Sequence, residues 1–134
     1  TYTYSKVSRT ALPWTNTLSD LRNNIEDTIG ETFNACLLNL YHNGLEGVGW
    51  HSDDEKELGR EPCIASLSLG AERKFVFKHK GNSEKVEIIL ASGSLLIMKG
   101  TCQQHWVHSL PKSKKVLHPR INLTFRTIYR SKDF

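Results

Sequence analysis

The stretch that decides the fold is CIASLSLGAERKFVFKHKGNSEKVEIILASGSLLIMKG, residues 63–100. Its short apolar runs cover residues 63–69, 74–77, 86–90 and 94–98, and glycine-containing segments separate them. Short runs of this kind between glycine-containing turns are typical of β-strands. Because no helical segment lies between the runs, they predict an antiparallel arrangement and not a parallel α/β sheet.

One helical pattern precedes this region. Leu18, Leu21, Ile25 and Ile29 recur at intervals of three, four and four residues, so they share one stripe of a helix. Gly30 follows the last of them, at a position where a left-handed residue ends a helix. We therefore expect one N-terminal flanking helix.

Everything after this helix is expected to be extended, including the apolar runs at residues 33–41 and 122–129. Many short strands with no helices between them predict a mainly β sandwich or barrel. For a chain of this length we expect a jelly-roll, the cupin-like double-stranded β-helix, whose open mouth can hold a metal ion.

The composition is that of one folded domain over residues 1–134, with 38% hydrophobic and 24% charged residues. We expect neither a membrane span nor a signal peptide, and nothing in the sequence demands an oligomer, so we expect a monomer. The expected location is the cytoplasm for a bacterial protein and the nucleus for a eukaryotic one. The three cysteines, Cys36, Cys63 and Cys102, have no close pairing and are expected to be reduced core thiols.

The charge is distributed unevenly along the chain. Residues 1–67 contain 5 Lys and Arg against 10 Asp and Glu, whereas residues 68–134 contain 13 against 4, so the halves carry −5 and +9. This asymmetry is compatible with a polyanionic partner, but a charge bias of this kind is more often just a solvated face.

His51 and Asp53 are the first candidates for chemistry. In an extended segment, residues two apart point to the same side and can bind one metal ion together. His108, in the alternating run at residues 105–108, is the candidate third ligand. Two histidines and one carboxylate on one face leave open positions, as in non-haem Fe(II) oxygenases. The alternative is an acidic surface loop.

Residues 120–126 supply a second polar constellation. Arg120, Asn122, Thr124 and Arg126 occupy one face of a strand, and the odd positions are apolar. The polar face is either an ordinary solvent-facing one or a clamp, because arginine pairs with carboxylates bidentately. A keto-dicarboxylate would serve both as the ligand of this clamp and as the co-substrate of the proposed iron.

Taken together, the segments NLYHNGLEGVGWHSDDEKELG, IASLSLGAERKFVFKHK, SGSLLIMKG, HWVHSLP and HPRINLTFRTIY resemble the AlkB family of Fe(II)- and 2-oxoglutarate-dependent oxidative dealkylases. The resemblance covers nearly the whole chain. It implies that His51, Asp53 and His108 bind Fe(II), and that Arg120 holds the distal carboxylate of 2-oxoglutarate. It also implies roles in binding 2-oxoglutarate for Arg126, Asn122, Asn39 and Tyr41.

For the substrate, the resemblance implies that Tyr4 and His51 sandwich a flipped base, with Tyr2 nearby. Asp54 would accept a hydrogen bond from the exocyclic amino group of the base, with Glu55 as a helper. The basic loop of Lys112, Lys114 and Lys115 would contact DNA phosphates. The chain begins inside the family's lid segment, so we expect the lid to be incomplete.

The resemblance implies oxidative demethylation of 1-methyladenine and 3-methylcytosine in DNA, with RNA as an alternative and formaldehyde as the second product. Fe(II), 2-oxoglutarate and O₂ would be required, with ascorbate as the reductant in vitro. Two other classes stay open, namely a 2-oxoglutarate dioxygenase acting on a protein or lipid and a non-catalytic jelly-roll binding module.

Overall fold

The computed structural model describes residues 2–4, 7–9 and 12–129, the first two segments as backbone only. Its elements, in chain order, are β1 (Tyr2–Tyr4), β2 (Val7–Arg9), α1 (Asn16–Ile29), β3 (Ala35–Tyr41), β4 (Val48–His51), η1 (Lys56–Leu58), β5 (Ile64–Gly70), β6 (Arg73–His79), β7 (Lys85–Leu90), β8 (Leu95–Met98), α2 (Cys102–His105), β9 (Trp106–Leu110) and β10 (Arg120–Arg126). No helix in the described part of the chain has the length and apolar character that crossing a membrane requires.

The predicted helix is confirmed. α1 begins after Thr15, whose Oγ1 accepts a hydrogen bond from the Leu18 N–H at 3.2 Å. It ends at Gly30, which adopts φ 74°, and its N–H donates to the Glu26 carbonyl at 2.8 Å. A residue with a side chain would be strained in this left-handed conformation, so glycine fits the end of the helix.

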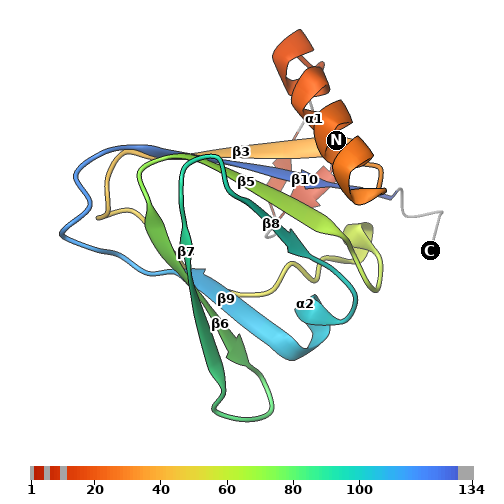
Figure 1. Cartoon of the computed structure of the whole chain (residues 1–134). Coiled ribbons are helices and arrows are strands. Elements are labelled where there is room, and N and C mark those ends of the chain that lie inside the picture. Colours follow the sequence, from red (N-terminus) through yellow and green to blue (C-terminus); the bar gives the residue numbers. More distant parts are fainter. Residues whose placement is uncertain (1, 5–6, 10–11, 130–134) are drawn as a thin grey trace.

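Two four-stranded antiparallel sheets carry the fold, in the orders β3-β10-β5-β8 and β4-β9-β6-β7. Figure 1 shows the two sheets as separate layers, with α1 lying across one end of β3, β10 and β5. The prediction of a mainly β jelly-roll with one flanking N-terminal helix is therefore confirmed. The cleft between the layers is where the polar residues of both sheets meet.

The core under α1 explains why β10 alternates so regularly. Leu123 and Phe125 point away from the second sheet and pack against Ile25 and Phe33, and Phe125 is fully buried. Trp14 stacks on Phe125 with ring centroids 6.3 Å apart. One face of β10 is thus covered by α1, which leaves its polar face for the interior of the sandwich.

The expectation that every segment after residue 30 is extended is wrong in two places. η1 and α2 are short helical turns, and α2 directly precedes β9, so His105 ends a helix and does not continue an alternating strand. β10 also ends at Arg126, because Ile128 leaves the ladder and exchanges two hydrogen bonds with the Asn34 side chain, at 2.8 and 2.9 Å. The cysteines are free, as predicted, but only partly buried.

Candidate active site

His51, Asp53 and His108 meet in space. Each offers one ligand atom, and these atoms all lie within 4.8 Å of one another. His51 ends β4 and is the direct partner of His108 on β9, so the sheet register fixes the two imidazoles, whose ring centroids are 4.3 Å apart. Asp53 follows β4, and its Oδ2 lies 3.5 Å from Nε2 of His108. The structure therefore joins three residues that are up to 57 positions apart in the sequence.

Both imidazoles suit a metal ion. Nδ1 of His51 lies 2.9 Å from the Gly49 carbonyl, which can only accept, so this nitrogen donates and Nε2 is the atom that can bind a metal ion. Burial lowers the pKa of His108 to about 4; Asp53 opposes this effect, while His51 and Arg126 add to it. His108 is therefore neutral at physiological pH, as a metal ligand must be.

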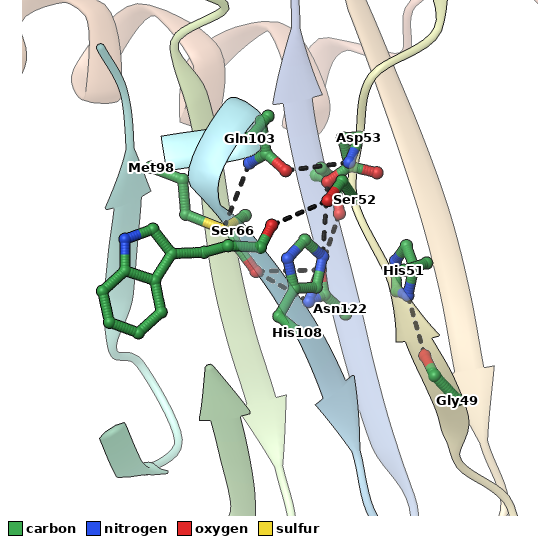
Figure 2. A network of polar contacts seen from close by, with 11 residues as sticks. Gly49, His51, Ser52, Asp53, Ser66, Met98, Gln103, His108 and Asn122 are labelled. Atoms are coloured by element: carbon green, nitrogen blue, oxygen red, sulfur yellow. Dashed lines mark hydrogen bonds and ion pairs between the residues drawn. The ribbon is translucent and has the colours of Figure 1, made fainter. Parts of the chain in front are cut away.

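Asp53 is held by the chain around it, as Figure 2 shows. Its backbone N–H donates to Oε1 of Gln103 at 2.8 Å, and the Gln103 amide donates to the Met98 sulfur at 3.6 Å. Next to it, the Ser52 hydroxyl donates to the Trp106 carbonyl at 2.7 Å. The α2–β9 junction thus fixes the loop that carries the carboxylate.

The polar face of β10 does not face solvent. Arg120, Asn122, Thr124 and Arg126 line an interior cavity together with the metal cluster, and both arginines are only 2% exposed. Asn39 and Tyr41 line the same cavity from β3, where they pair in register with Asn122 and Arg120. The structure thus brings together every residue expected to bind 2-oxoglutarate.

The surroundings of Arg120 suit the binding of an anion. Its Nη2 donates to the Ser68 hydroxyl at 2.9 Å, its guanidinium carbon lies 5.4 Å from the centre of the Tyr41 ring, and its buried Nε has no hydrogen-bond partner. In the described ranges, no carboxylate forms an ion pair with it. Burial lowers the pKa of Arg120 and raises that of Tyr41. A buried cation with an unused donor fits a ligand carboxylate.

A short polar network lines the same cavity as this arginine and the metal cluster. The Asn122 amide donates to the Ser66 hydroxyl at 2.8 Å, and the Thr124 hydroxyl donates to Oδ1 of Asn122 at 2.9 Å. These bonds orient the Asn122 side chain inside the cavity (Figure 2).

The expected substrate residues are more dispersed. Asp54 is exposed beside Asp53, whereas Glu55 is partly buried, and burial raises its pKa. The side chains of Tyr2 and Tyr4 lie outside the described residues. The lysines at positions 112, 114 and 115 are exposed in the loop that joins β9 to β10.

Several residues in the site or next to it escaped the sequence analysis. Ser66 and Ser68 contact the clamp from β5, and their alternation in IASLSL was a signal for an inward polar face. Gln103 lies in the four-residue helix α2, which no periodic pattern in the sequence predicts. Arg73 is 2% exposed and donates to the carbonyls of Glu46 and Pro111, contacts that depend on loops distant in sequence.

Comparison with known proteins agrees with this geometry. The profile of the family described as "2OG-Fe(II) oxygenase superfamily" matches residues 1–126. Over 138 residues the chain is 47% identical to human "Alpha-ketoglutarate-dependent dioxygenase alkB homolog 3", covering 96% of this chain and 48% of that protein. Over 140 residues it is 45% identical to human "DNA oxidative demethylase ALKBH2", covering 98% and 54%. The chain thus spans about half the length of the curated relatives it matches.

The solved structure of OsALKBH1 overlays with a TM-score of 0.58 and 22% identity, covering 81% of this chain and 61% of that one, which supports the fold. The AlkB resemblance inferred from the motifs is confirmed by the identity to the human homologues. Fe(II) and 2-oxoglutarate are the cofactor and co-substrate of the matched family, and the two histidines, the carboxylate and the buried arginines suit them. The chain belongs to the 2OG-Fe(II) oxygenase superfamily.

Proposed function

We propose that this chain catalyses oxidative demethylation of N-methylated bases, 1-methyladenine and 3-methylcytosine, in DNA. The observation that carries the proposal is the single cavity in which the His51, Asp53 and His108 cluster meets two buried arginines. The identity of 45–47% to the human alkB homolog 3 and DNA oxidative demethylase ALKBH2 supports the choice of substrate class.

In this proposal the metal cluster holds Fe(II) through Nε2 of His51, a carboxylate oxygen of Asp53 and His108. Arg120, supported by Ser68 and Tyr41, binds the distal carboxylate of 2-oxoglutarate, and Arg126 binds the carboxylate next to the keto group. When bound, the iron and its co-substrate supply the oxidation of the methyl C–H bond by O₂. The hydroxymethyl group then leaves the base nitrogen as formaldehyde.

The protein's own residues position the substrate and shield the reacting groups from water. Phe75, Leu110 and Met98 line the cavity beside the polar residues and exclude water from the reacting groups. Bases methylated at these nitrogens carry a positive charge, which Asp54 and Glu55 at the metal end would attract. Burial raises the pKa of Glu55.

The test is mass spectrometry of an oligonucleotide that contains one 1-methyladenine. It is incubated in air with the protein, Fe(II), 2-oxoglutarate and ascorbate, and His51→Ala serves as the control. Loss of one methyl group with the parent alone is the expected result, and matched DNA and RNA strands compare the two nucleic acids. Succinate formation without loss of the methyl group would favour a protein or lipid substrate. The absence of turnover with every substrate would favour a binding module.

A further inference from the structure

We propose that Arg60 and Lys80 form a phosphate-binding rim on a second cleft beside the metal cluster, which holds the backbone of the nucleic acid next to the reacting base. The inference rests on the proposed function, since it identifies where that substrate's phosphate binds. The chemical class of the ligand is a nucleotide phosphodiester, and the acids that line the same cleft would face its cationic base.

The cleft measures about 440 Å³ and is lined by Asp53, Asp54, Arg60, Lys80 and the two glutamines of α2. Asp53 also lines the interior cavity, which measures only about 80 Å³. The carboxylate therefore lies between a narrow interior and a wide cleft open to solvent. Sites for small organic ligands commonly measure about 300–1,000 Å³, so the wide cleft suits a nucleotide and the narrow one does not.

Both Lys80 and Arg60 line this cleft and form hydrogen bonds with α2. The Lys80 ammonium donates to the Gln103 carbonyl at 3.1 Å, and the Lys80 backbone N–H donates to the His105 carbonyl at 2.8 Å. From the other side, the Gln104 amide donates to the Arg60 carbonyl at 3.1 Å. The same four-residue helix that fixes Asp53 through Gln103 therefore also contacts the Lys80 ammonium and the backbone of Arg60.

The charges in the cleft are separated in a way that suits the ligand. Within the described residues, neither Arg60 nor Lys80 forms an ion pair with a carboxylate, and both are exposed. Lys74, by contrast, is paired with Glu87 at 3.6 Å on the same strand, β6, that Lys80 follows. A methylated nucleotide carries a positive base and a negative phosphate, so Asp54 and the two cations complement its two ends.

The first experiment measures direct binding of an unmethylated single-stranded oligonucleotide at several salt concentrations, by fluorescence anisotropy. Each phosphate contact on a single strand contributes about −0.7 to the slope of log K against log salt. Arg60→Gln and Lys80→Gln are each expected to make that slope shallower by about 0.7. Lys74→Gln, the matched control, should leave it unchanged, and Arg60→Lys and Lys80→Arg should restore most of it.

The second experiment compares demethylation of 1-methyldeoxyadenosine with that of the same nucleoside inside a trinucleotide. The parent should show a lower KM for the trinucleotide, and each charge-removing variant should raise that KM about tenfold, as loss of one charge-assisted hydrogen bond does. The KM and kcat for the free nucleoside should not change, because it offers no phosphate to the rim.

The outcomes separate the two proposals. If the parent demethylates the base and the variants keep both its salt slope and its trinucleotide KM, the phosphate rim is refuted and the proposed function stands. If no substrate is demethylated but the variants still lose the salt slope, the rim stands and the proposed function fails. If Lys80→Gln disturbs α2 and lowers nucleoside turnover as well, Arg60→Gln and the two charge-conserving variants decide the question.

Discussion

Gln103 accepts the backbone N–H of Asp53 at 2.8 Å, across 50 positions of sequence and between two different elements. Both residues are almost fully buried, at 2% and 4% exposure. A buried N–H needs a partner, and the Gln103 carbonyl oxygen supplies it at the residue that would bind the metal. Gln103 therefore acts on the metal as a positioning residue, through the orientation of the carboxylate.

We expect Gln103→Leu to weaken metal binding about 10- to 100-fold, the range observed when groups that orient metal ligands are removed. Gln103→Glu keeps an acceptor for the Asp53 N–H and should retain more affinity than the leucine variant. Isothermal titration with Mn(II), and the absorption spectrum of Co(II) as a probe of ligand geometry, would measure both effects.

Gln104→Leu is the matched control, since Gln104 has the same side chain on the same short helix but is exposed. It should bind Mn(II) like the parent and give the same Co(II) spectrum. Equal affinities for Gln103→Leu and the parent would show that the Asp53 loop is held without this hydrogen bond.

The contact between Ser68 and Arg120 leads to a second prediction. Ser68→Ala removes the 2.9 Å acceptor of Nη2 and leaves a buried donor without its partner, so the guanidinium is less firmly oriented. We expect the KM for 2-oxoglutarate to rise about fivefold while metal affinity is unchanged. Arg120→Gln removes the charge itself and should raise that KM far more. If Ser68→Ala and the parent had the same KM for 2-oxoglutarate, Ser68 would have no part in binding it.

The fold was predictable because its signals are local. The stripe from Leu18 to Ile29 and the left-handed Gly30 depend on residues a few positions apart, and so does the alternation of residues 120–126. Periodicity alone left open whether the polar face of that strand is solvated. The answer depends on the second sheet, which brings His51 and His108 over the strand. No local sequence pattern indicates that these two distant segments lie together.

The parts of the site that sequence reasoning missed are those defined by long-range contacts. Gln103 and Arg73 have ordinary sequence neighbours, and each is buried only because loops from elsewhere close over it. The metal residues could be predicted because His51 and Asp53 are two positions apart, and residues at that spacing in an extended chain point to the same side. Two residues at such a spacing therefore predict a shared site, whereas the sequence does not show which residues a single polar side chain will contact.

A third prediction concerns the stability of the protein at acidic pH. The pKa of His108 is about 4 in the folded protein, below its ordinary value of 6.5, because burial disfavours the charged form. Between these values the unfolded chain binds a proton that the folded chain does not, so the free energy of unfolding falls as the pH falls from 6.5 to 4. At about 1.4 kcal/mol for each pKa unit, the loss amounts to about 3 kcal/mol.

His108→Gln lacks this titration, so the metal-free variant should lose about 3 kcal/mol less stability than the parent over the same pH range. Urea denaturation in the presence of a chelator, at half-unit steps from pH 7 to 4, measures the difference. Parallel curves for the two proteins would mean that His108 titrates normally in the fold.

The last prediction follows from Arg73, a buried cation that lies outside both the metal cluster and the cavity. Its Nη2 donates to the Glu46 carbonyl at 2.8 Å and to the Pro111 carbonyl at 3.1 Å, so it ties the loop before β4 to the loop after β9. Its guanidinium carbon also lies 5.8 Å from the centre of the Tyr41 ring, on which Arg120 lies as well. Arg73 therefore supports the side chain that contacts the clamp.

Arg73→Met keeps most of the side-chain volume but removes the charged donor of the hydrogen bonds to the Glu46 and Pro111 carbonyls, so we expect the free energy of unfolding to fall by about 2–4 kcal/mol. The KM for 2-oxoglutarate should rise as Tyr41 loses its support, while metal affinity stays near that of the parent. Lys74→Met is the control, since Lys74 is exposed and its surface ion pair is worth less than about 1 kcal/mol. Equal stability of the two variants would show that the loops close without Arg73. A loss of stability without a change in KM would limit its role to the loops, because the geometry of Tyr41 would then not depend on it.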